Sequence, residues 1–141
     1  MKLAGFNFSK ISIEKLSEKI EGLKISTNID ISEINPIKAG LFKTKEEFLG
    51  VKFTYNVNYE PKIAKIALEG NIILAIEPKV AKEVLKQWKS KKMPEDFRIA
   101  IFNLVLKKSS LKALQLEDEL NLPLHIPLPS VKKGTSTDSK K

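Results

Sequence analysis

The stretch Val51-Lys52-Phe53-Thr54-Tyr55-Asn56-Val57-Asn58-Tyr59 alternates strictly between apolar and polar side chains. Side chains at positions i and i+2 of a strand share a face, so this pattern predicts an antiparallel strand with one buried and one solvated face. Pro61 follows shortly after and lacks the N–H that a strand ladder needs, which predicts that the strand ends there.

Similar patterns lie on both sides of this strand. Ile25 to Ile31 alternates in the same way, and Ile63 to Ile76 is nearly continuous in apolar residues. Gly70 interrupts the second segment, and we interpret it as a bend or bulge within one long strand. Leu3 to Ile13 alternates less regularly and predicts a further strand at the start of the chain.

The connections between these strands carry weaker signals. Leu16, Ile20 and Leu23 recur at helical spacing, and Gly22 would end a short helix or turn. Residues 35–50 contain a proline, two glycines and a charged run. They predict a loop with at most one turn of helix.

The hydrophobic period changes after Glu77. Pro78 suits the first turn of a helix, and Pro94, followed by two acidic residues, opens a second helix that is expected to reach about Asn121. The second helix carries two apolar stripes, one through Phe97, Ala100, Ile101, Leu104 and Val105, the other through Ile99, Phe102, Leu106, Ala113, Leu116 and Leu120. A small sheet covers only one stripe, so the other meets the chain itself, a second subunit or a bound partner. The candidate subunit interface is Ile99, Phe102, Leu106 and Ala113.

Residues 122–131, here called the strap, read Leu-Pro-Leu-His-Ile-Pro-Leu-Pro-Ser-Val. The prolines impose an extended path, and the aliphatic side chains need burial, so the strap either covers the core or lines a groove. Residues 132–141 are polar and basic and are expected to be disordered. The sequence therefore predicts one α+β domain over residues 1–131: an antiparallel four-stranded meander sheet, then two C-terminal helices and a proline-rich strap.

The composition restricts the chemistry. Among 141 residues there is no cysteine and only one histidine, His125, which argues against thiol catalysis, thiolate zinc sites and an enzyme in general. No cofactor or metal is expected. His125 lies between apolar strap residues, which favours a packing role. The carboxylates of Glu117, Asp118 and Glu119 are expected to be solvated at a helix end.

The chain is strongly basic. Its formal charge is +8, and Arg98 is the single arginine among 25 basic residues. Proteins that read base edges favour arginine for its planar fork, whereas abundant lysine, isoleucine and glutamate is typical of a thermophile surface. The lysine cluster that could contact phosphate is Lys86, Lys89, Lys91 and Lys92. The longest apolar run, Ile72 to Ile76, is far below the ~20 residues of a membrane span, so a cytoplasmic location is expected.

The order of these segments resembles the SecB family of export chaperones. Phe8 to Glu14 is similar to that family's first strand, and the segments 24–31, 51–59 and 63–76 are similar to the rest of its sheet. The long helix with Leu122-Pro123-Leu124-His125-Ile126-Pro127 is similar to the family's helix and proline-containing link. The resemblance is one of order and pattern across most of residues 3–131.

This resemblance implies a homo-oligomer, a tetramer in the family, that holds unfolded polypeptide in apolar grooves. The candidate client-binding residues are Phe53, Tyr55, Val57, Tyr59, Leu122, Leu124, Ile126 and Leu128. SecB proteins are acidic whereas this chain is basic, and its composition suggests a thermophilic archaeon, so a general or toxin–antitoxin-linked chaperone fits better than export. Two alternatives stay open: a basic archaeal protein that binds nucleic acid or the ribosome, and a structural subunit of a larger complex.

Overall fold

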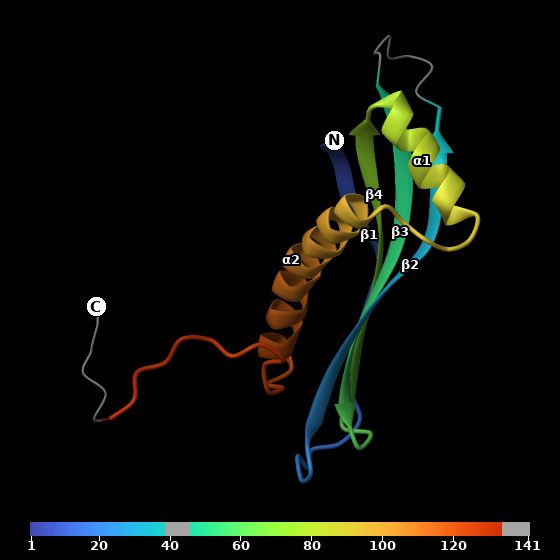
Figure 1. Ribbon diagram of the computed structural model, residues 1–141. Coiled ribbons are helices and arrows are strands. Elements are labelled where there is room, and N and C mark those ends of the chain that lie inside the picture. Colours follow the sequence, from blue (N-terminus) through green and yellow to red (C-terminus); the bar gives the residue numbers. More distant parts are fainter. Residues whose placement is uncertain (39–45, 134–141) are drawn as a thin grey trace.

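The computed structural model describes residues 1–38 and 46–133. Four strands precede two helices: β1 (Lys2–Lys15), β2 (Lys24–Ile37), β3 (Glu47–Glu60), β4 (Ala64–Ile76), α1 (Pro78–Trp88) and α2 (Glu95–Glu119). Both helices lie on the same side of one antiparallel sheet (Figure 1). The predicted fold class is thereby confirmed, whereas the single-domain assignment of residues 1–131 stays a prediction.

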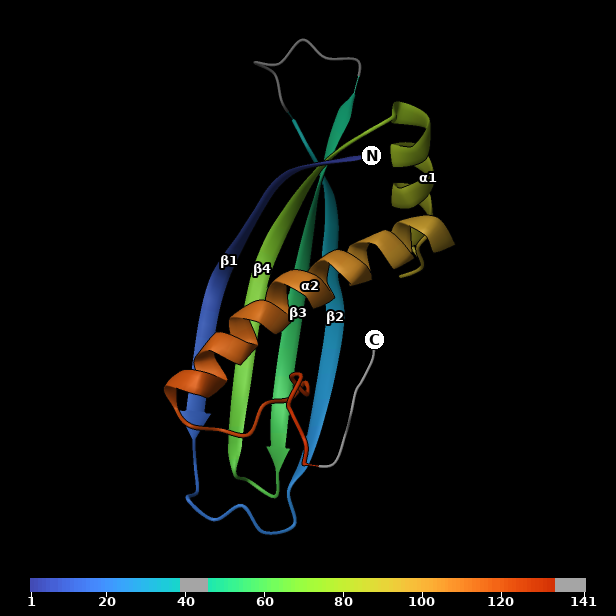
Figure 2. The ribbon, with the colours of Figure 1, turned by 90° about the vertical axis from the view of Figure 1, so that its left-hand side faces the viewer.

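The strand order in the sheet is β1-β4-β3-β2. Strands β2, β3 and β4 follow one another as a meander, and β1 adds to the free side of β4. The connection from β1 to β2 must therefore pass from one edge of the sheet to the other (Figure 2). This connection is a turn rather than the alternative short helix: Gly22 has a left-handed φ of 69°, and Leu16 and Ile20 are exposed.

The predicted loop over residues 35–50 is too long. Strand β2 continues to Ile37 and β3 already begins at Glu47. Pro36 fits within β2 because this strand lies at the edge of the sheet, where a missing N–H removes no ladder bond on the outer side. Residues 39–45 of the loop and residues 134–141 of the tail lie outside the described residues.

The core lies between the helices and one face of the sheet. Alternate side chains of β3, from Leu49 to Tyr59, are at most 1% exposed, as the alternation predicts. From α2, the predicted stripe of Phe97, Ile101 and Val105 is buried against this face. Helix α2 crosses the sheet diagonally, and its C-terminal end lies over β1 (Figure 2).

Gly70 lies within one continuous strand, β4, as interpreted from the sequence. It pairs with Phe8 on one side and Phe53 on the other. The Phe53 ring occupies the space above it, stacked on Phe6 with centroids 5.4 Å apart. A Cβ atom at Gly70 would lie 2.6 Å from Phe53 Cζ and 2.5 Å from the carbonyl oxygen of Asn7. The absence of a side chain therefore lets this aromatic cluster pack on the sheet.

We predict that Gly70→Ala destabilises the protein, because both the ring and the neighbouring backbone would have to move. The expected loss in the free energy of unfolding is about 1–3 kcal/mol, the range for an overpacked core, as measured by urea denaturation. Gly5→Ala is the matched control, since its Cβ would meet Ile73 at an ordinary 3.5 Å. Equal stabilities of the two variants would show that Gly70 does not set this packing.

Candidate functional site

The aromatic face of β3 is part of the core in this conformation. Phe53, Tyr55, Val57 and Tyr59 are each at most 1% exposed. Helix α2 and the start of the strap contribute the side chains that meet the two tyrosine hydroxyls. A client could reach these four residues only after that cover moved, so their assignment to client binding stays a prediction.

A buried polar cluster ties the sheet, α2 and the strap together. We call Tyr55, Tyr59, Ser110, Glu117 and His125 the tyrosine–glutamate cluster. The Tyr59 hydroxyl lies 2.5 Å from Glu117 Oε2 and 2.6 Å from the carbonyl oxygen of Pro123, so both acceptors are within reach of its single O–H donor. Glu117 is fully buried, which corrects the expectation that its carboxylate is solvated.

His125 connects the two tyrosines through Glu117. Its Nδ1 lies 2.9 Å from both carboxylate oxygens of Glu117, and its backbone N–H donates to Oε1 over 3.2 Å. Its Nε2 lies 2.9 Å from the Tyr55 hydroxyl, which also lies 3.1 Å from Ser110 Oγ. A neutral ring with the proton on Nδ1 satisfies both nitrogens, donating to Glu117 and accepting from Tyr55. The predicted packing role of His125 agrees with this geometry.

Burial raises the pKa of both tyrosines above the ordinary value near 10. For Tyr59, the hydrogen bond to Glu117 and the nearby negative charge raise the pKa further, because they favour the protonated phenol. For Tyr55, the hydrogen bond with Ser110 opposes the effect of burial. Both hydroxyls therefore stay protonated as donors over the physiological pH range.

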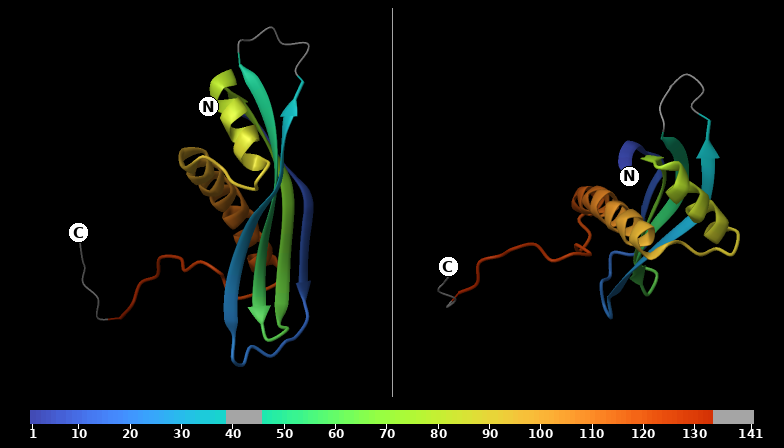
Figure 3. Two further views of the ribbon diagram at one scale, coloured as in Figure 1. Left: turned by 45° about the vertical axis from the view of Figure 1, so that its right-hand side comes forward. Right: turned by 45° about the horizontal axis from the view of Figure 1, so that its top comes forward.

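Only the start of the strap packs on the body. Leu122 is buried and Leu124 is half-buried, as a strap along the core requires. Ile126 and Leu128 are exposed, and Val131 is 99% exposed. Beyond His125 the chain leads away from the helices and the sheet (Figure 3). Polar contacts, rather than extensive apolar burial, hold the strap at its docked end.

The predicted interface residues of α2 divide between two sides of the helix. Ile99 and Leu106 are exposed by 46% and 42%, and Phe102 is half-buried. Ala113 is fully buried, because it lies on the same side of the helix as Val105, Ser109 and Glu117. Ala113 therefore offers no surface to a second copy here, whereas the other three residues do.

A groove lies between the β2 edge and the helices. It encloses about 420 Å³ and is lined by Asp30, Ile31, Ser32, Trp88, Lys91, Met93 and Phe102. The Lys91 ammonium lies 4.5 Å from the centroid of the Trp88 ring. Lys91 lies in the connection after α1 and has a left-handed φ of 58°. Because β2 pairs only with β3, its outer edge is unpaired by any strand among the described residues.

The lysine cluster lies beside this groove. Lys86 and Lys89 are at the end of α1, and Lys91 and Lys92 follow it; all four are exposed. Of the four, only Lys91 lines the groove. Contact between this cluster and phosphate therefore stays a prediction. For Lys86, Lys89 and Lys92 it rests on their exposure alone.

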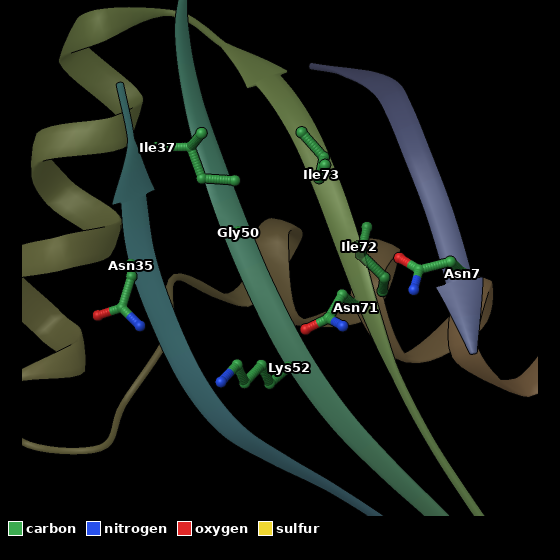
Figure 4. A pocket seen from close by; sticks show the side chains of 8 residues that line it. All are labelled: Asn7, Asn35, Ile37, Gly50, Lys52, Asn71, Ile72 and Ile73. Carbon is green, nitrogen blue, oxygen red and sulfur yellow. The ribbon is translucent and has the colours of Figure 1, made fainter. Parts of the chain in front are cut away.

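A second hollow lies on the opposite face of the sheet (Figure 4). It encloses about 360 Å³, and its lining residues include the amides of Asn7, Asn35 and Asn71 beside Lys52. Asn7 and Asn71 are register partners across β1 and β4. This face is the solvated one that the alternation of β3 predicts.

Two further features concern the described residues, 1–38 and 46–133. No group of three or more histidine, cysteine or acidic side chains there is placed to hold a metal ion. Neither helix in this part of the chain is long and apolar enough to cross a membrane.

Sequence reasoning missed Glu117 and the groove. One signal for Glu117 was available, since Ala113 and Glu117 are four residues apart and share a helix face. The two tyrosines on the buried face of β3 also require hydrogen-bond partners. The groove joins β2 to residues far along the chain, and no local pattern in the sequence places those segments together.

We predict that Glu117→Ala destabilises the protein and releases the strap. The Tyr59 hydroxyl would keep only the Pro123 carbonyl as acceptor, and the two His125 N–H groups would lose theirs; each buried polar group left unsatisfied typically costs roughly 1–3 kcal/mol. Urea denaturation would measure this loss, and limited proteolysis would detect cleavage between residues 122 and 133. Asp118→Ala changes the exposed neighbouring carboxylate and should shift stability by less than about 0.5 kcal/mol. Equal effects of the two substitutions would contradict the role of Glu117.

We also predict that stability falls in alkaline solution. The pKa of each tyrosine is raised in the folded state, so their contribution is complete below the unfolded pKa of about 10 and is lost as the pH rises above it. The chain has only these two tyrosines, so tyrosinate absorbance reports on the cluster alone. It should rise together with the loss of native circular dichroism. Ionisation near pH 10 without unfolding would refute this prediction.

No protein-family model matches the chain, and no curated protein matches its sequence. Among solved structures, the chain is similar to the SecB-like chaperone Rv1957 of Mycobacterium tuberculosis, in complex with a ChAD peptide from the Rv1956 HigA1 antitoxin. The match covers 95% of this chain and 92% of that chain, with a TM-score of 0.56 and 10% sequence identity. At this identity the likeness establishes the fold: four antiparallel strands followed by two helices, in a SecB-like arrangement.

Proposed function

We propose that this protein is a SecB-like chaperone that holds unfolded or extended apolar segments of polypeptide without catalysing a reaction. The observation that carries the proposal is the fold shared along almost the whole chain with a chaperone whose structure contains a bound peptide. An open groove with aromatic walls beside a strand edge supports it. A role in the cytoplasm of a thermophilic archaeon, as the composition suggests, is part of this proposal.

The groove is the surface at which we propose that a client first binds. An extended peptide can pair its backbone with an unpaired strand edge, while alternate side chains enter neighbouring pockets. The β2 edge offers the backbone groups, and Trp88, Met93 and Phe102 offer apolar contacts. The exposed strap residues Ile126 and Leu128 provide a second apolar surface. The buried residues Phe53, Tyr55, Val57 and Tyr59 would contact a client only after α2 and the start of the strap are displaced.

The alternative is binding to nucleic acid or the ribosome. The formal charge of +8 and the exposed cluster at Lys86, Lys89, Lys91 and Lys92 favour it. The two functions differ in their dependence on salt, because phosphate contacts weaken steeply as salt rises whereas apolar burial is not screened.

We predict that the protein suppresses the aggregation of a denatured enzyme diluted out of urea, and that suppression persists at high salt. Light scattering would follow aggregation, with an unrelated basic protein of similar size as the control. Parallel titrations with single-stranded RNA would test the alternative. RNA binding that collapses with salt, together with no suppression of aggregation, would refute the chaperone proposal.

Substitutions can distinguish the groove from the strap. Phe102→Asp places a charge in the groove and should weaken client binding at least tenfold, since losing one buried aromatic contact removes more than about 1.4 kcal/mol. Leu128→Asp changes the strap and should weaken binding less, while Lys65→Asp on the solvated face should have no effect. Circular dichroism would confirm that each variant is folded. A larger effect of Leu128→Asp would move the principal client surface to the strap.

We further propose that the protein is a homo-oligomer, with a tetramer as the SecB-like expectation. Ile99, Leu106 and Leu111 expose large apolar side chains along α2, a pattern typical of an interaction surface. We predict an oligomer at micromolar concentration by multi-angle light scattering, and its dissociation by Leu106→Glu. A monomeric wild-type protein under these conditions would contradict this.

A further inference from the structure

Cationic side chains lie over both large aromatic rings of the groove. The Lys91 ammonium lies 4.5 Å from the Trp88 ring centroid, and the Arg98 guanidinium carbon lies 6.0 Å from that of Phe102. Arg98 is the only arginine in the chain. Both rings line the groove, so a ligand on its apolar surface lies beside two positive charges.

These charges are not neutralised by the protein in the described part of the chain. Lys10, Lys15 and Lys52 form ion pairs with acidic residues outside the groove lining. Neither Lys91 nor Arg98 lies within 4.0 Å of a carboxylate oxygen there. Lys89 and Lys92 add further exposed positive charge next to Lys91. Lys91 and Arg98 therefore place positive charge directly beside the aromatic rings; the nearby acidic residues are Asp30 in the lining and Glu95 and Asp96 in the first turn of α2.

Building on the proposed chaperone function, we propose that the groove selects extended apolar segments that carry acidic side chains. Aspartate or glutamate on either side of an apolar residue would meet Lys91 and Arg98, while that residue contacts Trp88 or Phe102. Arginine suits this role because its planar guanidinium binds a carboxylate through two parallel hydrogen bonds. A segment flanked by lysine would instead bring like charges together and bind more weakly.

Aromatic rings beside cations also suit single-stranded RNA, whose bases stack and whose phosphates pair with lysine. One observation favours a peptide. The unpaired edge of β2 offers backbone hydrogen bonds that match an extended peptide.

The backbone at Lys91 provides a test that preserves the fold. Its φ of 58° lies in the left-handed region, which glycine adopts without strain. Lys91→Gly therefore removes the charge and also relieves the strain of the left-handed backbone conformation. Lys62 is also exposed and left-handed, with a φ of 47°, and lies in the turn between β3 and β4. Lys62→Gly is thus a matched control for the change in charge, residue type and conformation.

Trp88 is the only tryptophan, so its fluorescence reports binding at the groove. Three peptides with one apolar core and flanking glutamate, glutamine or lysine residues would be titrated into the full chain. We expect the glutamate peptide to bind roughly tenfold more tightly than the glutamine peptide, at about threefold for each surface charge pair, and the lysine peptide to bind more weakly than either. Lys91→Gly should reduce this preference about threefold and Lys62→Gly should leave it unchanged. Arg98→Gln should act like Lys91→Gly.

The outcomes separate this proposal from the chaperone function. Equal binding of the three peptides, or equal effects of Lys91→Gly and Lys62→Gly, would overturn the acidic preference while leaving the chaperone function in place. No binding of any peptide, together with no suppression of aggregation, would overturn both. Single-stranded RNA that changes Trp88 fluorescence in a Lys91-dependent manner, without any response to peptides, would assign the groove to nucleic acid.

Discussion

Burial of the aromatic face of β3 is the constraint on which the other elements depend. Phe53, Tyr55, Val57 and Tyr59 are at most 1% exposed, and one sheet has no second sheet to cover them. Both helices must therefore lie on the same side, which leaves the amide-lined face to solvent. Gly70 belongs to this constraint, because the Phe53 ring fits over β4 only where no side chain intervenes.

The same constraint explains the tyrosine–glutamate cluster. A tyrosine buried on a sheet brings a hydroxyl that needs a partner, and an unpaired hydroxyl would cost about 1–3 kcal/mol. Glu117 from α2 supplies this partner for Tyr59, and His125 supplies it for Tyr55. In turn, the strap is bound where these hydrogen bonds are available and leaves the surface beyond them. The docked position of the strap thus depends on polar groups in the core and not on its own aliphatic residues alone.

The elements could be predicted from the sequence where one local pattern decides the outcome. The alternation in β3 and the change of period at Pro78 locate strands and helices, and Gly70 is correctly interpreted as part of one strand. The edge-to-edge connection after β1 and the burial of Glu117 depend on segments that are distant in sequence, so their local patterns mislead. The candidate site is affected most. Aromatic alternation marks residues that can be buried, and it does not distinguish a client surface from a core that the chain covers itself.

Whether an apolar surface is left open or is covered by the chain itself determines how such a fold can combine stability with binding. An apolar surface large enough to hold an unfolded client would be covered by the protein's own helices if they could reach it, as happens to the aromatic face of β3. The groove beside β2 is left open because the connection between α1 and α2 meets the sheet at an edge, where the backbone of β2 has no further strand. Its aromatic walls remain accessible. The cations over the rings would repel a neighbouring basic surface, including the lysine-rich face of another copy. Under the proposed function, positive charge at this edge would serve two purposes: it would disfavour pairing of the open strand edge with copies of the same chain, and it would leave that edge available to segments of opposite charge.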